Sequence, residues 1–172
     1  MKKLVVALSI IPLLVVGISA QDKKWRQATA RELKGVLPAR ATVITERIET
    51  EMRTASGVTD GAGRFIAGVV MITAGYQAEG KYSHFFITQA PIKIGEIDLK
   101  PGEYIFGTKR MDNDTLEVSF YESASGKALG TIHASLEQKR GPVYSLAITP
   151  GANGNKTMVK IGRFYFELAL QN

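Results

Sequence analysis

Residues 115–121 read Thr-Leu-Glu-Val-Ser-Phe-Tyr, and hydrophobic side chains alternate with others through the whole stretch. Leu116, Val118 and Phe120 share one parity, and the residues between them are a glutamate and a serine. A period of two is that of a β-strand that buries one face and exposes the other. The stretch therefore predicts a half-buried strand.

Similar short runs continue on both sides of this stretch, separated by turn residues such as Pro101-Gly102. Turn signals every 8–12 residues predict about nine short strands, which is typical of a sandwich or small barrel. Residues 41–172 are therefore expected to form a single antiparallel β-sandwich. The apolar run Phe65–Thr73 predicts a central strand covered on both faces, and the glycine-rich segment 56–63 predicts a loop.

Residues 21–40 are expected to form a helical segment before the sandwich. Apolar side chains recur on one face of a helix from 22 to 35, and Gly35 stands where a C-terminal cap belongs. Thr29 and Glu32 also match a capping box, which would begin a shorter helix.

The first twenty residues have the order of a secretory signal peptide. Met1–Lys3 is basic, residues 4–18 are almost wholly apolar, and small residues follow before the chain turns polar. The alternative is a membrane anchor, but the apolar run of about 15 residues is shorter than the roughly 20 that a spanning helix needs. We expect cleavage between Ala20 and Gln21 and a periplasmic or secreted protein.

Composition narrows the class of protein further. Cleavage would leave 152 residues, enough for one domain with an adequate core, and would lower the formal charge from +6 to +4 by removing Lys2 and Lys3. The basic residues are scattered, so we expect no nucleic-acid partner. The chain has no cysteine, which excludes disulfides, cysteine-bound metals and a thiol nucleophile. A secreted domain without disulfides favours a bacterial source.

No catalytic or metal-binding pattern is evident. The only two histidines, His84 and His133, have no partner histidine at metal-ligand spacing. There is no Gly-x-Ser-x-Gly motif, and no carboxylate pair stands out for glycoside hydrolysis. The sequence therefore predicts no catalytic residues, no cofactor and no metal.

Aromatic side chains are the remaining candidates for a binding site. Tyr82 and His84 share a strand parity, while Tyr121 and Tyr165 fall on faces opposite neighbouring phenylalanines. Exposed tyrosines on a sheet can stack on sugars or contact a protein. We take Tyr82, His84, Tyr121 and Tyr165 as a candidate ligand surface; the alternative is that packing covers them.

The segment Leu99-Lys100-Pro101-Gly102-Glu103-Tyr104 resembles the Leu-Pro-x-Gly-x-Tyr turn and strand of exported bacterial β-sandwich modules of transthyretin-like and carboxypeptidase-regulatory-like type. The stretch 116–130, with Ser-Gly-Lys in its turn, is similar to the hairpin that follows in such modules. The resemblance covers residues 92–130, with a lysine where proline is commoner. It implies a sandwich fold and carries no functional residues.

These observations predict an exported, non-enzymatic β-sandwich protein with a binding or interaction role at the bacterial cell envelope. The expected partner is an envelope protein or a glycan, with no membrane insertion after signal removal. One alternative is a small outer-membrane β-barrel, although the predicted strands are shorter than the 9–11 residues that such strands need. Others are a secreted hydrolase acting on sugars or cell wall, and a subunit that polymerises through strand edges.

Overall fold

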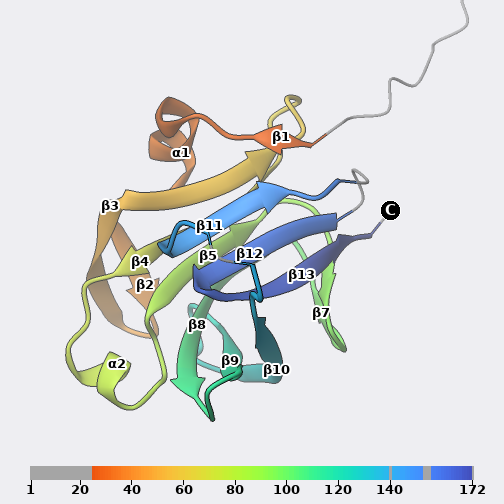
Figure 1. Ribbon diagram of the computed structural model, residues 1–172. Helices are drawn as coiled ribbons and strands as arrows, with labels where there is room; N and C mark the ends of the chain where they lie inside the picture. The colour runs from red at the N-terminus through yellow and green to blue at the C-terminus, as the bar shows by residue number, and fades with distance from the viewer. Residues whose placement is uncertain (1–24, 140, 153–155, 172) are drawn as a thin grey trace, which may run out of the picture.

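The computed structural model describes residues 25–139, 141–152 and 156–171. Within them, thirteen strands join in one antiparallel sheet that curls until it is nearly closed (Figure 1). The all-β prediction is confirmed, but the strands form one strongly curved sheet and not clearly a nine-strand sandwich. Alternating hydrophobic and polar residues along a strand indicate that one face of the strand is buried. They do not indicate whether a second sheet or another part of the same sheet covers that face.

The elements follow one another from β1 near the N-terminus to β13 at the C-terminus. In chain order they are β1 (Arg26–Gln27), α1 (Ala30–Val36), β2 (Arg40–Val43), β3 (Glu46–Thr59), β4 (Phe65–Met71), α2 (Gly75–Ala78), β5 (His84–Thr88), β6 (Ile92–Ile94), β7 (Ile97–Leu99), β8 (Gly102–Arg110), β9 (Thr115–Glu122), β10 (Ala128–Leu136), β11 (Tyr144–Pro150), β12 (Lys156–Gly162) and β13 (Phe164–Leu170).

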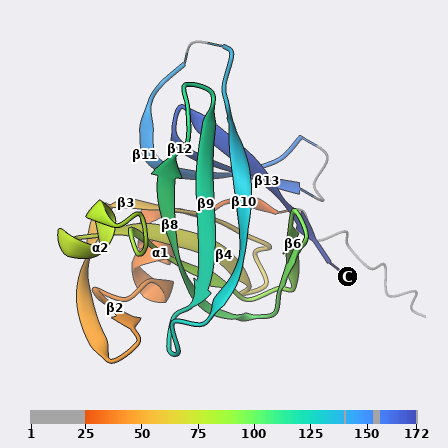
Figure 2. The ribbon, with the colours of Figure 1, turned by 90° about the horizontal axis from the view of Figure 1, so that it is seen from below.

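The main path of the sheet runs β3-β4-β5-β8-β9-β10-β13-β12-β11, with β1 beside β3. Strand β2 pairs with the first half of β3, and the β6–β7 hairpin attaches to β13. Figure 2 shows β8, β9 and β10 as long neighbouring strands along one wall of the curve. Within the described residues, no helix is long and apolar enough to cross a bilayer.

Two hydrophobic clusters lie on opposite faces of the sheet. The inner cluster fills the curve and includes Phe86, Phe106 and Phe120. The outer cluster lies between β4, β5 and β8 on one side and α1 and β2 on the other, and includes Phe85 and Leu33. All five residues of β5 are buried, because both faces of this strand are covered. The predicted central strand is likewise present as β4.

Thr29 is the N-cap of helix α1, and its hydroxyl accepts a hydrogen bond from the backbone N–H of Glu32. The Glu32 carboxylate accepts in return from the Thr29 N–H at 2.8 Å, which completes the capping box. The shorter of the two sequence-predicted helices is therefore the correct one. Gly35 lies inside the helix and Leu37 is its C-cap, whereas Arg26–Gln27 forms strand β1. The predicted signal peptide and its cleavage site at Ala20 and Gln21 lie outside the described residues.

Candidate ligand groove at the β3–β11 seam

Strands β3 and β11 lie side by side at the two ends of the curled sheet and point the same way (Figure 1). The nine strands from β3 to β11 alternate in direction at every step. An odd number of alternating strands brings the first and the last together in parallel, so the closing pair cannot continue the antiparallel pattern. No ladder joins β3 to β11 among the described residues. We call this junction the seam.

Two polar side chains bridge the seam at one point. The Ser56 hydroxyl accepts from the Ile148 N–H at 2.8 Å and lies 3.3 Å from the Ile148 carbonyl oxygen. The Gln27 side-chain amide donates to the Ile148 carbonyl at 3.1 Å and to the Gly57 carbonyl at 3.0 Å. These bonds replace a backbone ladder and satisfy both polar groups of Ile148 that face β3.

Both strands bulge beside this bridge. Five steps along β3, from Glu51 to Ser56, face only two steps along β4, from Val70 to Gly68. The Thr54 hydroxyl accepts from the Val70 N–H at 3.0 Å, which compensates for the interrupted ladder. On β11 the register shifts between residues 144 and 147. Bulges bend a strand locally, and here they leave a groove between the two strands.

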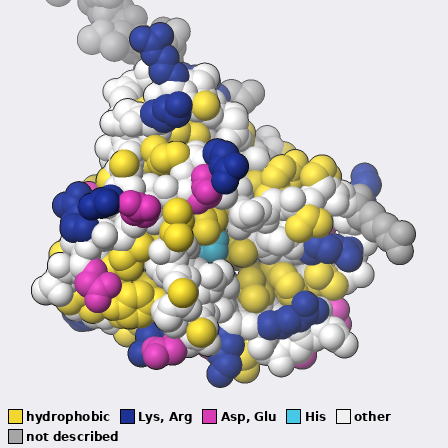
Figure 3. Space-filling view, turned by 90° about the vertical axis from the view of Figure 1, so that its left-hand side faces the viewer, with side chains coloured by type: hydrophobic (Ala, Val, Ile, Leu, Met, Phe, Trp, Pro, Cys, Tyr) yellow, Lys and Arg dark blue, Asp and Glu magenta, His cyan; other side chains and the backbone are white. Residues whose placement is uncertain are grey.

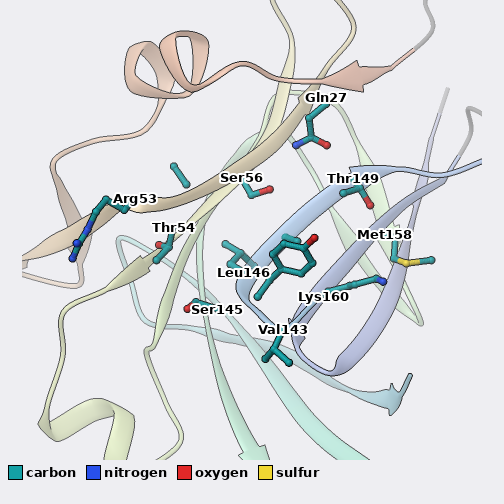
Figure 4. A pocket seen from close by; sticks show the side chains of 13 residues that line it. Gln27, Arg53, Thr54, Ser56, Val143, Ser145, Leu146, Thr149, Met158 and Lys160 are labelled. Atoms are coloured by element: carbon teal, nitrogen blue, oxygen red, sulfur yellow. The ribbon is translucent and has the colours of Figure 1, made fainter. Parts of the chain in front are cut away.

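The groove has a volume of about 630 Å³. In Figure 4, Arg53, Ser56 and Gln27 lie along one side and Thr149, Met158 and Lys160 along the other. The full lining is Gln27, Arg53, Thr54, Ala55, Ser56, Val143, Tyr144, Ser145, Leu146, Ala147, Thr149, Met158 and Lys160. The volume is in the range of natural small-ligand sites.

Exposed apolar side chains lie next to paired cations in this groove. Val143 is 68% exposed and Tyr144 is 43% exposed, although both are large hydrophobic residues. Arg53 forms an ion pair with Glu51 at 2.9 Å, and this hydrogen bonding lowers the pKa of Glu51 to about 2. Lys160 pairs with Glu137 at 2.7 Å. Among the described residues that line the groove there is no aspartate or glutamate.

The His84 ring lies beside the β11 bulge. Its Nδ1 is 2.8 Å from the Ser83 hydroxyl, its Nε2 is 3.5 Å from the Ser145 carbonyl oxygen, and the ring stacks on Phe106 with centroids 4.6 Å apart. Burial lowers the pKa of His84 to about 4, and the Ser145 carbonyl opposes this only in part. A neutral ring with its proton on Nε2 fits both contacts, because Ser83 can then donate to Nδ1.

The four residues of the predicted ligand surface do not gather at one place. Tyr82 and Tyr121 meet edge to face with ring centroids 5.1 Å apart, and Tyr82 is buried in the outer cluster. His84 is buried beside the groove. Tyr165 lies on β13, where its register partners are Lys160 and Ser135.

Sequence reasoning missed the groove residues for identifiable reasons. Ser56 and Gly57 belong to a glycine-rich segment that predicts a loop, yet β3 continues to Thr59. Tyr144 has the parity of the buried Leu146 and Ile148, but the bulge separates it from them and leaves it exposed. The exposure of Tyr144 could have been predicted only by locating the bulge in β11, and the sequence carries no clear signal for a bulge there.

Other features are weaker candidates. A smaller groove of about 380 Å³ lies between β3 and α2, where the Tyr76 hydroxyl donates to Glu46 at 3.0 Å. Among the described residues, no group of three or more histidine, aspartate or glutamate side chains could hold a metal ion.

Comparison with known proteins finds no matching family model, no matching curated protein and no matching solved structure. The residues that carry the transthyretin-like resemblance fall on β6 to β10, and their relation to those modules stays a prediction.

Proposed function

We propose that this chain is an exported, non-enzymatic binding protein of the bacterial cell envelope, and that a glycan chain binds in the groove at the seam. The observation that carries the proposal is the combination of an exposed aromatic ring, Tyr144, with hydroxyl and amide groups along one groove. Sugars present an apolar face that stacks on an aromatic ring and a rim of hydroxyls that forms hydrogen bonds.

The electrostatics of the groove favour an uncharged ligand. Both lining cations, Arg53 and Lys160, already have carboxylate partners. On the face shown in Figure 3, basic and acidic side chains are interspersed with hydrophobic ones and neither sign forms a continuous patch. A strongly anionic partner such as nucleic acid would need clustered basic residues.

The width of the seam argues against a peptide that enters as an extra strand. Cα atoms of β3 and β11 approach within 8 Å of one another. A strand inserted between them would require a separation of roughly 9–10 Å, twice the spacing of neighbouring strands. A glycan chain that lies over the groove does not have to fit between the two strands, so their separation does not exclude it.

The lining also favours binding over hydrolysis. Glycosidases use two carboxyl groups that flank the scissile bond. The described lining of the groove has none, and the nearby Glu51 and Glu137 are engaged in ion pairs. The secreted hydrolase is therefore the less favoured alternative.

The two facing layers of a sandwich stay a prediction for this curved sheet. Strand β11 packs across the inner cluster onto β4, where a Cβ added to Gly68 would lie 3.1 Å from Leu146. We infer that the β3–β4–β5 side and the β11–β12–β13 side act as two facing layers joined by the long strands β8, β9 and β10.

Glycan binding is tested with residues 21–172 and a panel of N-acetylglucosamine oligomers, peptidoglycan glycan strands and neutral glucans, measured by calorimetry. Replacing Tyr144→Ala should weaken binding about tenfold, because the stacking surface is lost. The matched control is Tyr76→Ala on α2, which lies outside this groove and should bind like the parent. If no glycan binds, or if both variants lose affinity equally, the proposal is wrong.

Export is tested separately by expressing the full chain in a bacterium and determining the N-terminus of the product. Cleavage should leave Gln21 as the first residue, in the periplasm or the medium. A product that retains residues 1–20 in the cytoplasm would exclude the envelope role without affecting the groove.

A further inference from the structure

His84 connects the rigid centre of the sheet to one wall of the groove. The ring belongs to β5, whose five residues are all buried between β4 and β8. Its Nε2 faces the carbonyl of Ser145, which lies in the β11 bulge and lines the groove next to Tyr144. A single side chain therefore positions the segment that carries the exposed ring.

We propose that His84 is a pH-sensitive latch: the neutral ring holds residues 143–145 of the bulge against β5, and protonation releases them. The inference rests on the proposed function for its biological meaning, because the released segment carries Tyr144. Mild acid would then raise the population of the open groove, which no longer holds its ligand.

The surroundings of His84 offer nothing that would balance a charged ring. Strands β4, β5 and β11 contain no acidic or basic residue other than His84 itself. The other neighbouring elements carry charged residues in larger number: Glu103, Lys109 and Arg110 on β8, Glu46, Arg47, Glu49, Glu51 and Arg53 on β3, and Lys156 and Lys160 on β12. None of them contributes to the pKa of His84, which burial and the Ser145 carbonyl set alone. An imidazolium there would be a buried charge held only by neutral oxygens.

The bulge is the element that can yield. Strand β5 is hydrogen-bonded on both sides and covered on both faces, so it cannot expose the ring without disrupting the core. Val143 and Tyr144 are largely exposed, and their displacement uncovers little apolar surface. Leu146 is 5% exposed and stays packed in the inner cluster, so the movement would end before it. The bridge of Ser56 and Gln27 to Ile148 lies beyond that point and stays in place.

The size of the effect follows from linkage. The ring has a pKa of about 4 when the latch is closed, and it would return to about 6.5 when the bulge opens and water reaches it. Protons then favour the open form increasingly as the pH falls below 6.5. Between pH 7 and pH 5 the ratio of open to closed should rise about 20-fold.

The test is hydrogen exchange of the backbone amides of residues 144–146 at pH 7 and pH 5, corrected for the intrinsic pH dependence of exchange. The parent chain and the control His133→Gln, which changes an exposed histidine, should lose protection about 20-fold. His84→Gln can still donate to Ser145 but cannot titrate, so its protection should not change. The amides of residues 116–120 in β9 report global unfolding and should stay protected.

An equal loss in the parent and in His84→Gln would overturn the latch, as would no loss in the parent. If the glutamine variant does not fold, the parent decides alone: loss at 144–146 without loss at 116–120 supports the latch, and parallel loss or none overturns it. The experiment contains no glycan, so failure of the latch and failure of the proposed function are distinguished.

Discussion

Two glycines of this chain differ in whether a neighbouring segment packs too closely to leave room for a side chain. A Cβ on Gly107 would lie 1.4 Å from the Lys81 carbonyl oxygen, because the chain before β5 crosses directly over β8. Gly107→Ala should therefore destabilise the protein by more than about 3 kcal/mol. A Cβ on Gly35 in α1 would meet no atom within 4 Å, so Gly35→Ala should stabilise by about 0.5–1 kcal/mol. Urea unfolding of both variants measures the contrast, and equal effects would contradict the crossing at Gly107.

A second residue-scale prediction concerns a buried hydroxyl. Thr157 on β12 is fully buried, and its Oγ1 has no hydrogen-bond partner among the described residues. Replacing a buried, unpaired hydroxyl with a methyl group removes a desolvation cost of about 1–3 kcal/mol. Thr157→Val should therefore raise the free energy of unfolding by about 1 kcal/mol. Thr59→Val is the control, since the Thr59 hydroxyl donates to the Arg64 carbonyl at 2.9 Å and its loss should destabilise.

Among the elements, the seam depends on side chains where the rest of the sheet depends on backbone ladders. Ser56→Ala leaves the Ile148 N–H without its partner, which should cost about 1–3 kcal/mol and speed exchange of that amide. Ser119→Ala removes a hydroxyl contact to Thr131 on an exposed face and should cost less than about 0.5 kcal/mol. Equal losses in urea unfolding would show that the bridge does not hold the seam.

The same contrast explains which elements the sequence could predict. The alternation in β9, the apolar run of β4 and the capping box of α1 are local patterns, and each is present in the structure. The curl of the sheet, the bridge to Ile148 and the exposed Tyr144 depend on bulges and on contacts between segments about 90 residues apart. The periodicity of neighbouring residues carries no information about those contacts. The candidate surface of Tyr82, His84, Tyr121 and Tyr165 therefore includes His84, which lies beside the groove, but no residue that lines it.

For the molecule as a whole, two buried titratable groups set separate pH ranges for stability. The folded pKa of His84, about 4, lies below its unfolded value of 6.5, so the unfolded chain binds more protons between these values. Stability should thus be full above pH 6.5 and fall by about 3 kcal/mol down to pH 4. Burial raises the pKa of Asp60, but bonds from Arg64 and from two backbone N–H groups outweigh it and lower the pKa below 3.8. The stability from Asp60 is present above that value and is lost only in stronger acid.

Urea unfolding at pH 7, 6 and 5.5 therefore isolates the histidine, because the carboxylates whose pKa the fold lowers, Asp60, Glu32 and Glu51, are almost fully ionised in the folded and the unfolded chain over this range. The parent chain and His133→Gln should lose stability together as the pH falls, and His84→Gln should lose less by the amount that its imidazole contributed. A flat profile in the parent would mean that His84 takes up its proton in the folded protein at little cost. That outcome would contradict its placement as a neutral ring packed on Phe106, with only the Ser83 hydroxyl and the Ser145 carbonyl as polar partners.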